Sequence, residues 1–231
     1  MTQFYFLHIG GINDIVQMFI QSIRITNPNS KIIQITDTRS EKISFVDNCI
    51  RYEGDVSNLM KFRTEAFSKI KFDDNSANIF LDSDMLIIKK INTEILFNDF
   101  QSVLCQRFYD VDEPVNFNYM NLKMFENINK KLGDVWPILG CFIALKNENV
   151  FQEVNHIYDQ LEKKYYKWYG DQIALKIFYE KNKKNIKLVN EKIFANAYPD
   201  ENYVESYILH FKGSKKKRMK DYFNNIFKKD V

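Results

Sequence analysis

"NIFLDSDMLIIK", residues 78–89, carries an apolar run into two aspartates and a second apolar run away from them. Asp82 and Asp84 therefore lie where a buried strand would leave the core. Ionised carboxylates are costly to desolvate, so a pair in this position calls for a partner. Hard oxygen ligands suit Mg²⁺ or Mn²⁺, which bridge carboxylates to the phosphates of a substrate. Aspartates are also ordinary turn residues, so the pair alone is equally compatible with a solvated turn.

The chain before this stretch alternates strand and helix patterns. Strands are predicted at 4–9, 31–36, 48–52 and 77–82, and helices at 14–27 and 58–70. Asn13 or Asp14 would cap the first helix and Ser57 the second. This alternation predicts an α/β fold with a doubly wound, mostly parallel central sheet and helices on both faces. Ligands of such sheets bind beyond the carboxyl ends of the strands, where Asp82 and Asp84 would lie.

The second half of the chain continues the same type of pattern. Further strands are predicted at 102–108, 137–145 and 207–211, and helices near 149–165, 171–182 and 215–229. No linker or change in composition divides the chain. We therefore expect one domain over residues 1–231, in which residues 215–231 form a basic C-terminal helix or tail.

Composition narrows the class of protein. The 231 residues are 45% hydrophobic and include 33 Phe and Tyr, which is ample for a core. The three cysteines are odd in number and far apart, so a disulfide framework is not expected and a reducing, cytoplasmic compartment is. The first residues lack the pattern of a signal peptide, and no apolar run is long enough to span a bilayer. We expect a soluble protein, at most peripheral at the inner membrane face.

The basic residues gather at the C-terminal end. The last 20 residues hold eight Lys or Arg and two acidic residues, interleaved with Tyr222, Phe223, Ile226 and Phe227. Such a segment could dock on an anionic membrane surface, or its aromatic face could pack on the domain. Nucleic acid is not an expected partner, because the basic patch is confined to one end and no recognised binding motif accompanies it.

Two further motifs, and Arg63 on its own, contain residue types found in binding sites. His210, Gly213 and Lys216 follow an apolar strand in "ILHFKGSKK" and could supply a metal ligand, a close backbone approach and a phosphate contact. Asp171 and Gln172 follow Gly170 at the start of a helix, where Asp171 has the chemistry of an N-cap or could face a cleft.

Arg63 lies on the helix that precedes the aspartate pair. An exposed helical arginine is usually solvated, but its guanidinium can also fork onto a phosphate or a ribose.

Two enzyme classes use an apolar strand that ends in Asp-x-Asp. Phosphatases of the haloacid dehalogenase type have Asp-x-Asp-x-Thr near the start of the chain, with the first aspartate as nucleophile. Here Leu86 occupies the threonine position and the motif lies 80 residues into the chain. The other class is the GT-A glycosyltransferases, which hold a divalent ion against a nucleotide-sugar diphosphate.

The ordered set Arg63, "FLDSD", "ILGCFIAL", "YGDQ" and "HFKGSKK" resembles the glycogenin-like family of retaining GT-A enzymes, which includes bacterial lipopolysaccharide galactosyltransferases. The resemblance implies a metal site for Mn²⁺, or Mg²⁺, made by Asp82, Asp84 and His210. It also implies that Asp171 and Gln172 face the donor sugar as catalytic residues. The nucleotide-sugar would be bound by Ile9, Gly10, Arg63, Asp82, Ser83, Asp84, Gly213 and Lys216.

The chain departs from the family pattern at two places. Ile138-Leu139-Gly140 stands where the family has Asn-x-Gly, which loses a contact to a sugar hydroxyl, and Lys217-Arg218 stands where it has Pro-Trp. The donor sugar is therefore not assigned by the resemblance.

The function expected from the resemblance is metal-dependent transfer of a hexose from a nucleotide-diphosphate sugar, such as a UDP-sugar, to a glycan or lipid-linked acceptor, with retention. If Asp112 or Glu113 acted as a base on the acceptor, the outcome would be inversion. An aspartate-dependent phosphatase or phosphotransferase and a catalytically silent nucleotide-binding GT-A domain are the alternatives.

Overall fold

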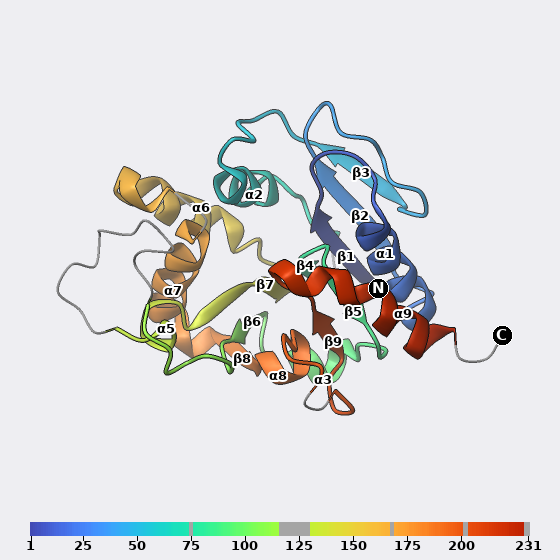
Figure 1. Ribbon diagram of the computed structural model, residues 1–231. Helices are drawn as coiled ribbons and strands as arrows, with labels where there is room; N and C mark the ends of the chain where they lie inside the picture. Colours follow the sequence, from blue (N-terminus) through green and yellow to red (C-terminus); the bar gives the residue numbers. More distant parts are fainter. Residues whose placement is uncertain (74–75, 116–129, 167–168, 201–202, 229–231) are drawn as a thin grey trace.

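The computed structural model describes residues 1–73, 76–115, 130–166, 169–200 and 203–228 (Figure 1). The predicted C-terminal helix at 215–229 and the tail at 215–231 extend into residues 229–231, which lie outside the described residues.

A seven-stranded sheet in the order β3-β2-β1-β4-β7-β6-β8 forms the centre of the described chain. The strands are β1 (Thr2–Leu7), β2 (Lys31–Thr36), β3 (Asn48–Arg51), β4 (Ala77–Leu81), β6 (Ser102–Gln106), β7 (Ile138–Leu145) and β8 (Ile186–Asn190). All neighbouring strands run parallel, except that β7 is antiparallel to both β4 and β6. The prediction of a mostly parallel central sheet is confirmed.

A second sheet has two antiparallel strands, β5 (Met85–Ile87) and β9 (Ile208–His210). The α-helices are α1 (Asp14–Thr26), α2 (Leu59–Ser68), α3 (Thr93–Phe97), α5 (Leu132–Val135), α6 (Phe151–Gln160), α7 (Gly170–Asn182), α8 (Glu191–Phe194) and α9 (Met219–Phe227). Short 3₁₀ helices lie at Lys163–Tyr165, Lys183–Asn185 and Gly213–Arg218.

Helices cover both faces of the large sheet, and each face has its own apolar core. Successive strand side chains point to opposite faces, so Phe4 and Phe6 of β1 enter one core while Tyr5 enters the other. Helices α1 and α9 bury their apolar sides in the first core, and α2, α6 and α7 bury theirs in the second (Figure 1). The doubly wound α/β architecture is therefore confirmed.

The helix caps confirm one prediction, correct another and decide between the two alternatives left open for Asp171. The side chain of Asn13 accepts a hydrogen bond from the amide of Val16 and caps α1, as expected. Asn58, not Ser57, caps α2, because its side chain oxygen reaches the amide of Lys61. Asp171 is not an N-cap. It lies in the first turn of α7, one residue past the helix start, and its carboxylate is engaged elsewhere.

Two strands were not predicted. β8 has the short sequence "IKLVN" and lies at the sheet edge, where only Ile186 and Val189 are buried and the apolar signal is weak. β5 follows the aspartate turn directly and coincides with the second apolar run of residues 78–89, but it is only three residues long. The strand predicted at 207–211 is shorter than expected and pairs with β5, away from the central sheet.

The C-terminal helix α9 packs against α1 and buries Met219 and Phe223 in the core. Tyr222, Ile226 and Phe227 are partly buried against the same core. Of the two alternatives for this segment, packing of its aromatic face on the domain is the one observed.

Two expectations from composition can be compared with the structure. Cys49, Cys105 and Cys141 are all free thiols, so the prediction of no disulfide framework holds. Within the ranges that the structure describes, no helix has the length and apolar character required to cross a bilayer.

Candidate functional site

The aspartate pair lies between the two sheets. Asp82 follows β4 directly, and Ser83 and Asp84 form the turn into β5. Because Met85 of β5 pairs with His210 of β9, the imidazole is brought beside this turn from a segment more than 120 residues later. The Asp84 carbonyl accepts a hydrogen bond from the Phe211 amide at 2.9 Å and fixes the two segments together. The small sheet therefore assembles the candidate site.

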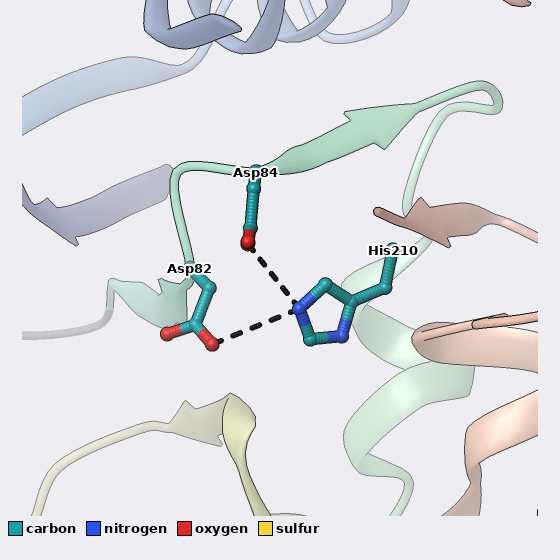
Figure 2. Close-up of side chains that lie close together, drawn as sticks. All are labelled: Asp82, Asp84 and His210. Atoms are coloured by element: carbon teal, nitrogen blue, oxygen red, sulfur yellow. Dashed lines mark ion pairs between the residues drawn. The ribbon is translucent and has the colours of Figure 1, made fainter. Parts of the chain in front are cut away.

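Asp82, Asp84 and His210 converge on one point (Figure 2). The His210 Nε2 atom lies 3.2 Å from Asp84 Oδ1 and 3.8 Å from Asp82 Oδ2. One ligand atom from each residue lies within 4.8 Å of the other two. The Nδ1 atom of His210 is buried and makes no hydrogen bond. Nε2 is the nitrogen that faces the carboxylates. Two carboxylate oxygens and one imidazole nitrogen suit a divalent ion such as Mn²⁺.

Two cations flank this cluster. The Lys216 Nζ atom lies 3.0 Å from Asp84 Oδ2. Arg63 Nη1 lies 2.7 Å from Asp82 Oδ1, and the other terminal nitrogen of Arg63 pairs with Asp171 Oδ2. Each cluster aspartate thus has one oxygen facing His210 and one facing a cation, which fixes the directions of both carboxylates.

The charges in the cluster shift its pKa values. Burial raises the pKa of Asp82, and Arg63 opposes that effect without cancelling it. Burial also acts on Asp84, but His210 and Lys216 outweigh it and hold the pKa of Asp84 well below its usual range. The cluster therefore keeps at least one carboxylate ionised at neutral pH.

The cluster opens into a cleft of about 650 Å³, within the size range of small-molecule sites. The predicted residues that line it are Arg63, Asp82, Ser83, Asp84, Asp171, Gln172, His210, Gly213 and Lys216. Ile9 and Gly10 are not among the lining residues. Gly10 has a left-handed φ of 100°, and its amide donates to Ser40 Oγ at 2.7 Å. Their assignment to nucleotide binding stays a prediction.

Besides His210, three side chains that line the cleft carry buried polar atoms without a hydrogen-bond partner. These atoms are Asp171 Oδ1, Gln172 Oε1 and Trp136 Nε1. Buried polar groups in proteins are almost always paired. Two acceptors and one donor left open beside one cleft therefore favour a ligand rich in hydroxyl groups.

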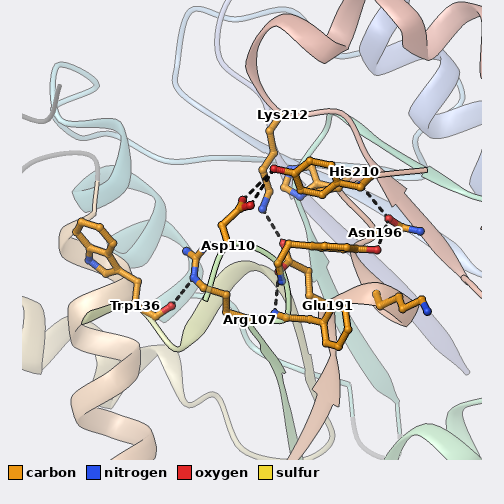
Figure 3. A network of polar contacts seen from close by, with 12 residues as sticks. Arg107, Asp110, Trp136, Glu191, Asn196, His210 and Lys212 are labelled. Carbon is orange, nitrogen blue, oxygen red and sulfur yellow. Dashed lines mark hydrogen bonds and ion pairs between the residues drawn. The ribbon is translucent and has the colours of Figure 1, made fainter. Parts of the chain in front are cut away.

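Sequence reasoning missed several residues of the cleft. Arg107, Asp110, Trp136 and Lys212 line it (Figure 3). Tyr169 lines it as well, and its ring stacks on that of Trp136 with the centroids 4.4 Å apart. Arg107 comes directly after β6, and the ends of neighbouring strands gather at one sheet edge. The strand predicted at 102–108 has Arg107 near its end, and this position was an available signal.

The acidic loop after β6 also differs from expectation. Asp112 is 81% exposed and pairs with Lys131 at 2.6 Å, and neither it nor Glu113 lines the cleft. Asp110 lines it instead, and both of its carboxylate oxygens accept from the hydroxyl of Tyr198, at 3.1 and 3.0 Å. Asp110 has a φ of 59°, a conformation that a non-glycine residue adopts at a cost.

No family model and no curated protein matches the sequence. Among solved structures, the crystal structure of a glycosyltransferase involved in the glycosylation of the major capsid of PBCV-1 is similar, with a TM-score of 0.57. The match covers 95% of this chain and 98% of the other.

The chain has a GT-A-type fold. The sequences are 9% identical over the match, so the likeness concerns the fold alone. The mostly parallel sheet with one antiparallel strand agrees with this fold. Membership of the glycogenin-like family remains a prediction.

Replacing Gly140 by alanine should disturb the pair formed by Arg63 and Asp171. A Cβ atom at this position in β7 would lie 2.7 Å from Arg63 Nη2 and 3.0 Å from Asp171 Oδ2. The charged groups would have to move apart, so we expect a loss of about 1–3 kcal/mol in the free energy of unfolding, measured by urea denaturation. Gly11→Ala is the matched control, because its added Cβ meets no atom within 4 Å. Equal stability of the two variants would contradict the prediction.

Glu191 should make the protein sensitive to acid. Its buried carboxylate accepts from the amides of Phe108 and Tyr109 at 3.0 and 3.1 Å and pairs with Lys212 Nζ at 2.9 Å. Burial alone would raise the pKa of Glu191, but Lys212 and the two amides hold it below the usual value. A carboxyl whose pKa is lowered by folding stabilises the folded state above the unfolded pKa, and that stability is lost as the pH falls.

We therefore expect Glu191→Gln to lower the free energy of unfolding at pH 7 by about 1–3 kcal/mol. The difference in unfolding free energy between this variant and the wild type should become smaller as the pH falls below about 4.5. Urea unfolding at several pH values measures both effects. Glu148→Gln, at an exposed carboxylate, is the control. A difference that stays constant down to pH 3 would show that the charge of Glu191 is not the cause.

Proposed function

We propose that the protein is a metal-dependent glycosyltransferase that moves a hexose from a nucleotide-diphosphate sugar, such as a UDP-sugar, to a glycan or lipid-linked acceptor. The observation that carries the proposal is the convergence of Asp82, Asp84 and His210 at one cleft of a GT-A fold. Paired aspartates alone are common, but these two meet an imidazole and a lysine from a distant segment. That combination supplies both a cation site and a charge for a phosphate.

In this proposal Asp82, Asp84 and His210 hold the ion, Mn²⁺ or Mg²⁺. The bound ion would act as a Lewis acid toward the diphosphate leaving group. Lys216 extends from the 3₁₀ helix at Gly213–Arg218 to the same point, so its ammonium would add positive charge where the leaving group becomes more negative.

Asp171 and Gln172 would orient the transferred sugar. Each presents a buried oxygen without a partner at the cleft, and each can accept a hydrogen bond from a sugar hydroxyl. Arg63 holds the other oxygen of Asp171 and thereby fixes the direction of the free one. Retention of configuration is part of the proposal and is supported only by the sequence resemblance to retaining enzymes.

A thermal-shift screen of nucleotide-sugars with Mn²⁺ tests the proposal. A ligand at 100 times its Kd stabilises the folded state by about 2.7 kcal/mol, and for a chain of this size each kcal/mol raises Tm by roughly 2–4 °C. We expect one nucleotide-sugar to raise Tm by roughly 5–10 °C, with Mn²⁺ required for the full effect. Donor turnover without any loss in EDTA would contradict the metal dependence.

The two alternatives have their own outcomes. Release of phosphate from a phosphomonoester, but not from a nucleotide-sugar, would indicate a phosphatase, which the GT-A fold does not favour. Nucleotide binding without turnover of any donor would indicate a silent domain.

Peripheral membrane contact through the basic tail, from the cytoplasmic side, is part of the same proposal. The buried aromatic face of α9 leaves charged side chains for such a contact, among them the exposed Lys220 of α9 and the exposed Lys217 of the preceding 3₁₀ helix. Co-sedimentation with anionic liposomes, comparing the wild type with Lys217→Gln/Lys220→Gln, would measure it.

A further inference from the structure

Arg107 occupies a fixed position at the cleft. Its backbone amide donates to the carbonyl of Pro137 at 2.8 Å, and its Nε atom donates to the carbonyl of Trp136 at 2.8 Å (Figure 3). These two bonds hold the half-buried side chain against the cleft wall. They leave the two terminal nitrogens of the guanidinium free to bind a ligand.

The pairing of Arg107 differs from that of the other cations at the cleft. Arg63 pairs with Asp82 and Asp171, Lys216 with Asp84, and Lys212 with Glu191. Across the described ranges, Arg107 has no carboxylate oxygen within 4.0 Å. Of these four cations at the cleft, Arg107 is therefore the one whose charge is available to bind an anionic group of a ligand.

Asp110 is the carboxylate nearest in the sequence, and among the described residues it forms no ion pair with Arg107. Both of its oxygens accept from the Tyr198 hydroxyl. Lys212 also lines this end of the cleft, but its charge is compensated by the buried Glu191.

The position of Arg107 separates it from the diphosphate end. Strands β4 and β6 both pair antiparallel with β7, so they run in the same direction and end at the same edge of the sheet. Asp82 follows β4 and Arg107 follows β6, two strand spacings apart, or roughly 9–10 Å. At that separation from the proposed metal ligands, an anion bound by Arg107 would belong to the sugar or the acceptor and not to the diphosphate.

We propose that Arg107 binds an anionic group, a carboxylate or a phosphate, carried by the transferred sugar or by the acceptor. This inference rests on the proposed function. A guanidinium binds such planar or tetrahedral anions through two parallel hydrogen bonds, which gives selectivity over a neutral hydroxyl group. The transferred sugar or the acceptor would therefore carry a carboxylate or a phosphate.

Isothermal titration calorimetry with Mn²⁺ present separates the two sources of the anion. In the first arm the probes are UDP, UDP-glucose and UDP-glucuronate. In the second arm the protein is saturated with UDP, and the probes are glucuronate and glycerol 3-phosphate, with glucose and glycerol as neutral counterparts. We expect one anionic probe to bind roughly 10- to 100-fold tighter than its neutral counterpart.

Arg107→Gln should remove this preference, and Arg107→Lys should retain only part of it, because a lysine keeps the charge without the fork. Lys220→Gln, which removes an exposed charge on α9, should keep the preference in full. The preference is a ratio within each variant, so a general loss of affinity cancels.

Two results overturn the inference. If UDP with Mn²⁺ does not bind the wild type, the proposed function and this inference fail together. If UDP binds but no anionic probe is preferred, or Arg107→Gln keeps the preference, the inference about Arg107 fails and the proposed function stands.

Discussion

Replacing Asp84 by asparagine should abolish binding of Mn²⁺ and reduce metal-dependent turnover of a nucleotide-sugar on the order of 10³-fold. Asp84 is the aspartate nearest to the His210 imidazole and also pairs with Lys216, so it links the proposed metal ligands to the lysine proposed to bind phosphate. Asparagine keeps the shape of the side chain but removes the negative charge that a divalent ion requires. Calorimetric titration with Mn²⁺ alone measures the effect before any substrate is known.

Asp112→Asn is the matched control for this experiment. Asp112 is an exposed carboxylate that pairs with Lys131 and does not line the cleft, so its loss should leave the Mn²⁺ affinity unchanged. Circular dichroism and Tm would show whether both variants are folded. A folded Asp84→Asn protein that binds Mn²⁺ as tightly as the wild type would rule out the metal site.

Replacing Arg63 by methionine should cost about 3–5 kcal/mol of unfolding free energy. The Arg63 side chain is 12% exposed and pairs with two carboxylates, of which Asp171 is only 2% exposed. Without the guanidinium, Asp171 would be a buried charge with no countercharge. Urea denaturation in EDTA measures the loss, because EDTA excludes compensation by a bound ion.

Two comparisons test the cause of that loss. Arg218→Met breaks an exposed pair with Asp200, in which both side chains are about half exposed, and should leave the stability nearly unchanged. Arg63→Met combined with Asp171→Asn should recover part of the stability lost in Arg63→Met, since the buried charge is then removed. If the double variant is no more stable than Arg63→Met, the uncompensated charge of Asp171 is not the cause.

The class of fold could be predicted because the burial of a strand or helix produces a pattern of apolar residues within its own sequence. β1, β2 and β4 read as apolar strands, and α1 and α2 read as helices, because each element must present apolar side chains to a core at its own period. The elements that were missed, β5 and β8, are short, and their partners lie far away in the sequence. Their own sequences are too short to distinguish them from a loop.

The site could be predicted only in part. Most of the proposed site residues were recognised in ordered motifs, and the structure brings nine of them to one cleft. The role of Asp171 was uncertain between a cap and a cleft residue, and its contact with Arg63, 108 positions away, decides that it is not a cap. Arg107 and Asp110 were not recognised, because no motif surrounds them.

The sequence by itself determined the alternation of strands and helices and the residue types available for a metal and a phosphate. Only the tertiary structure decided that β9 pairs with β5, which places His210 beside Asp84, and that Arg107 faces the same cleft without a carboxylate. The physical reason is that periodic burial acts between neighbouring residues of the chain. The meeting of charged side chains depends instead on strand order and on crossovers, which bring together segments more than 100 residues apart.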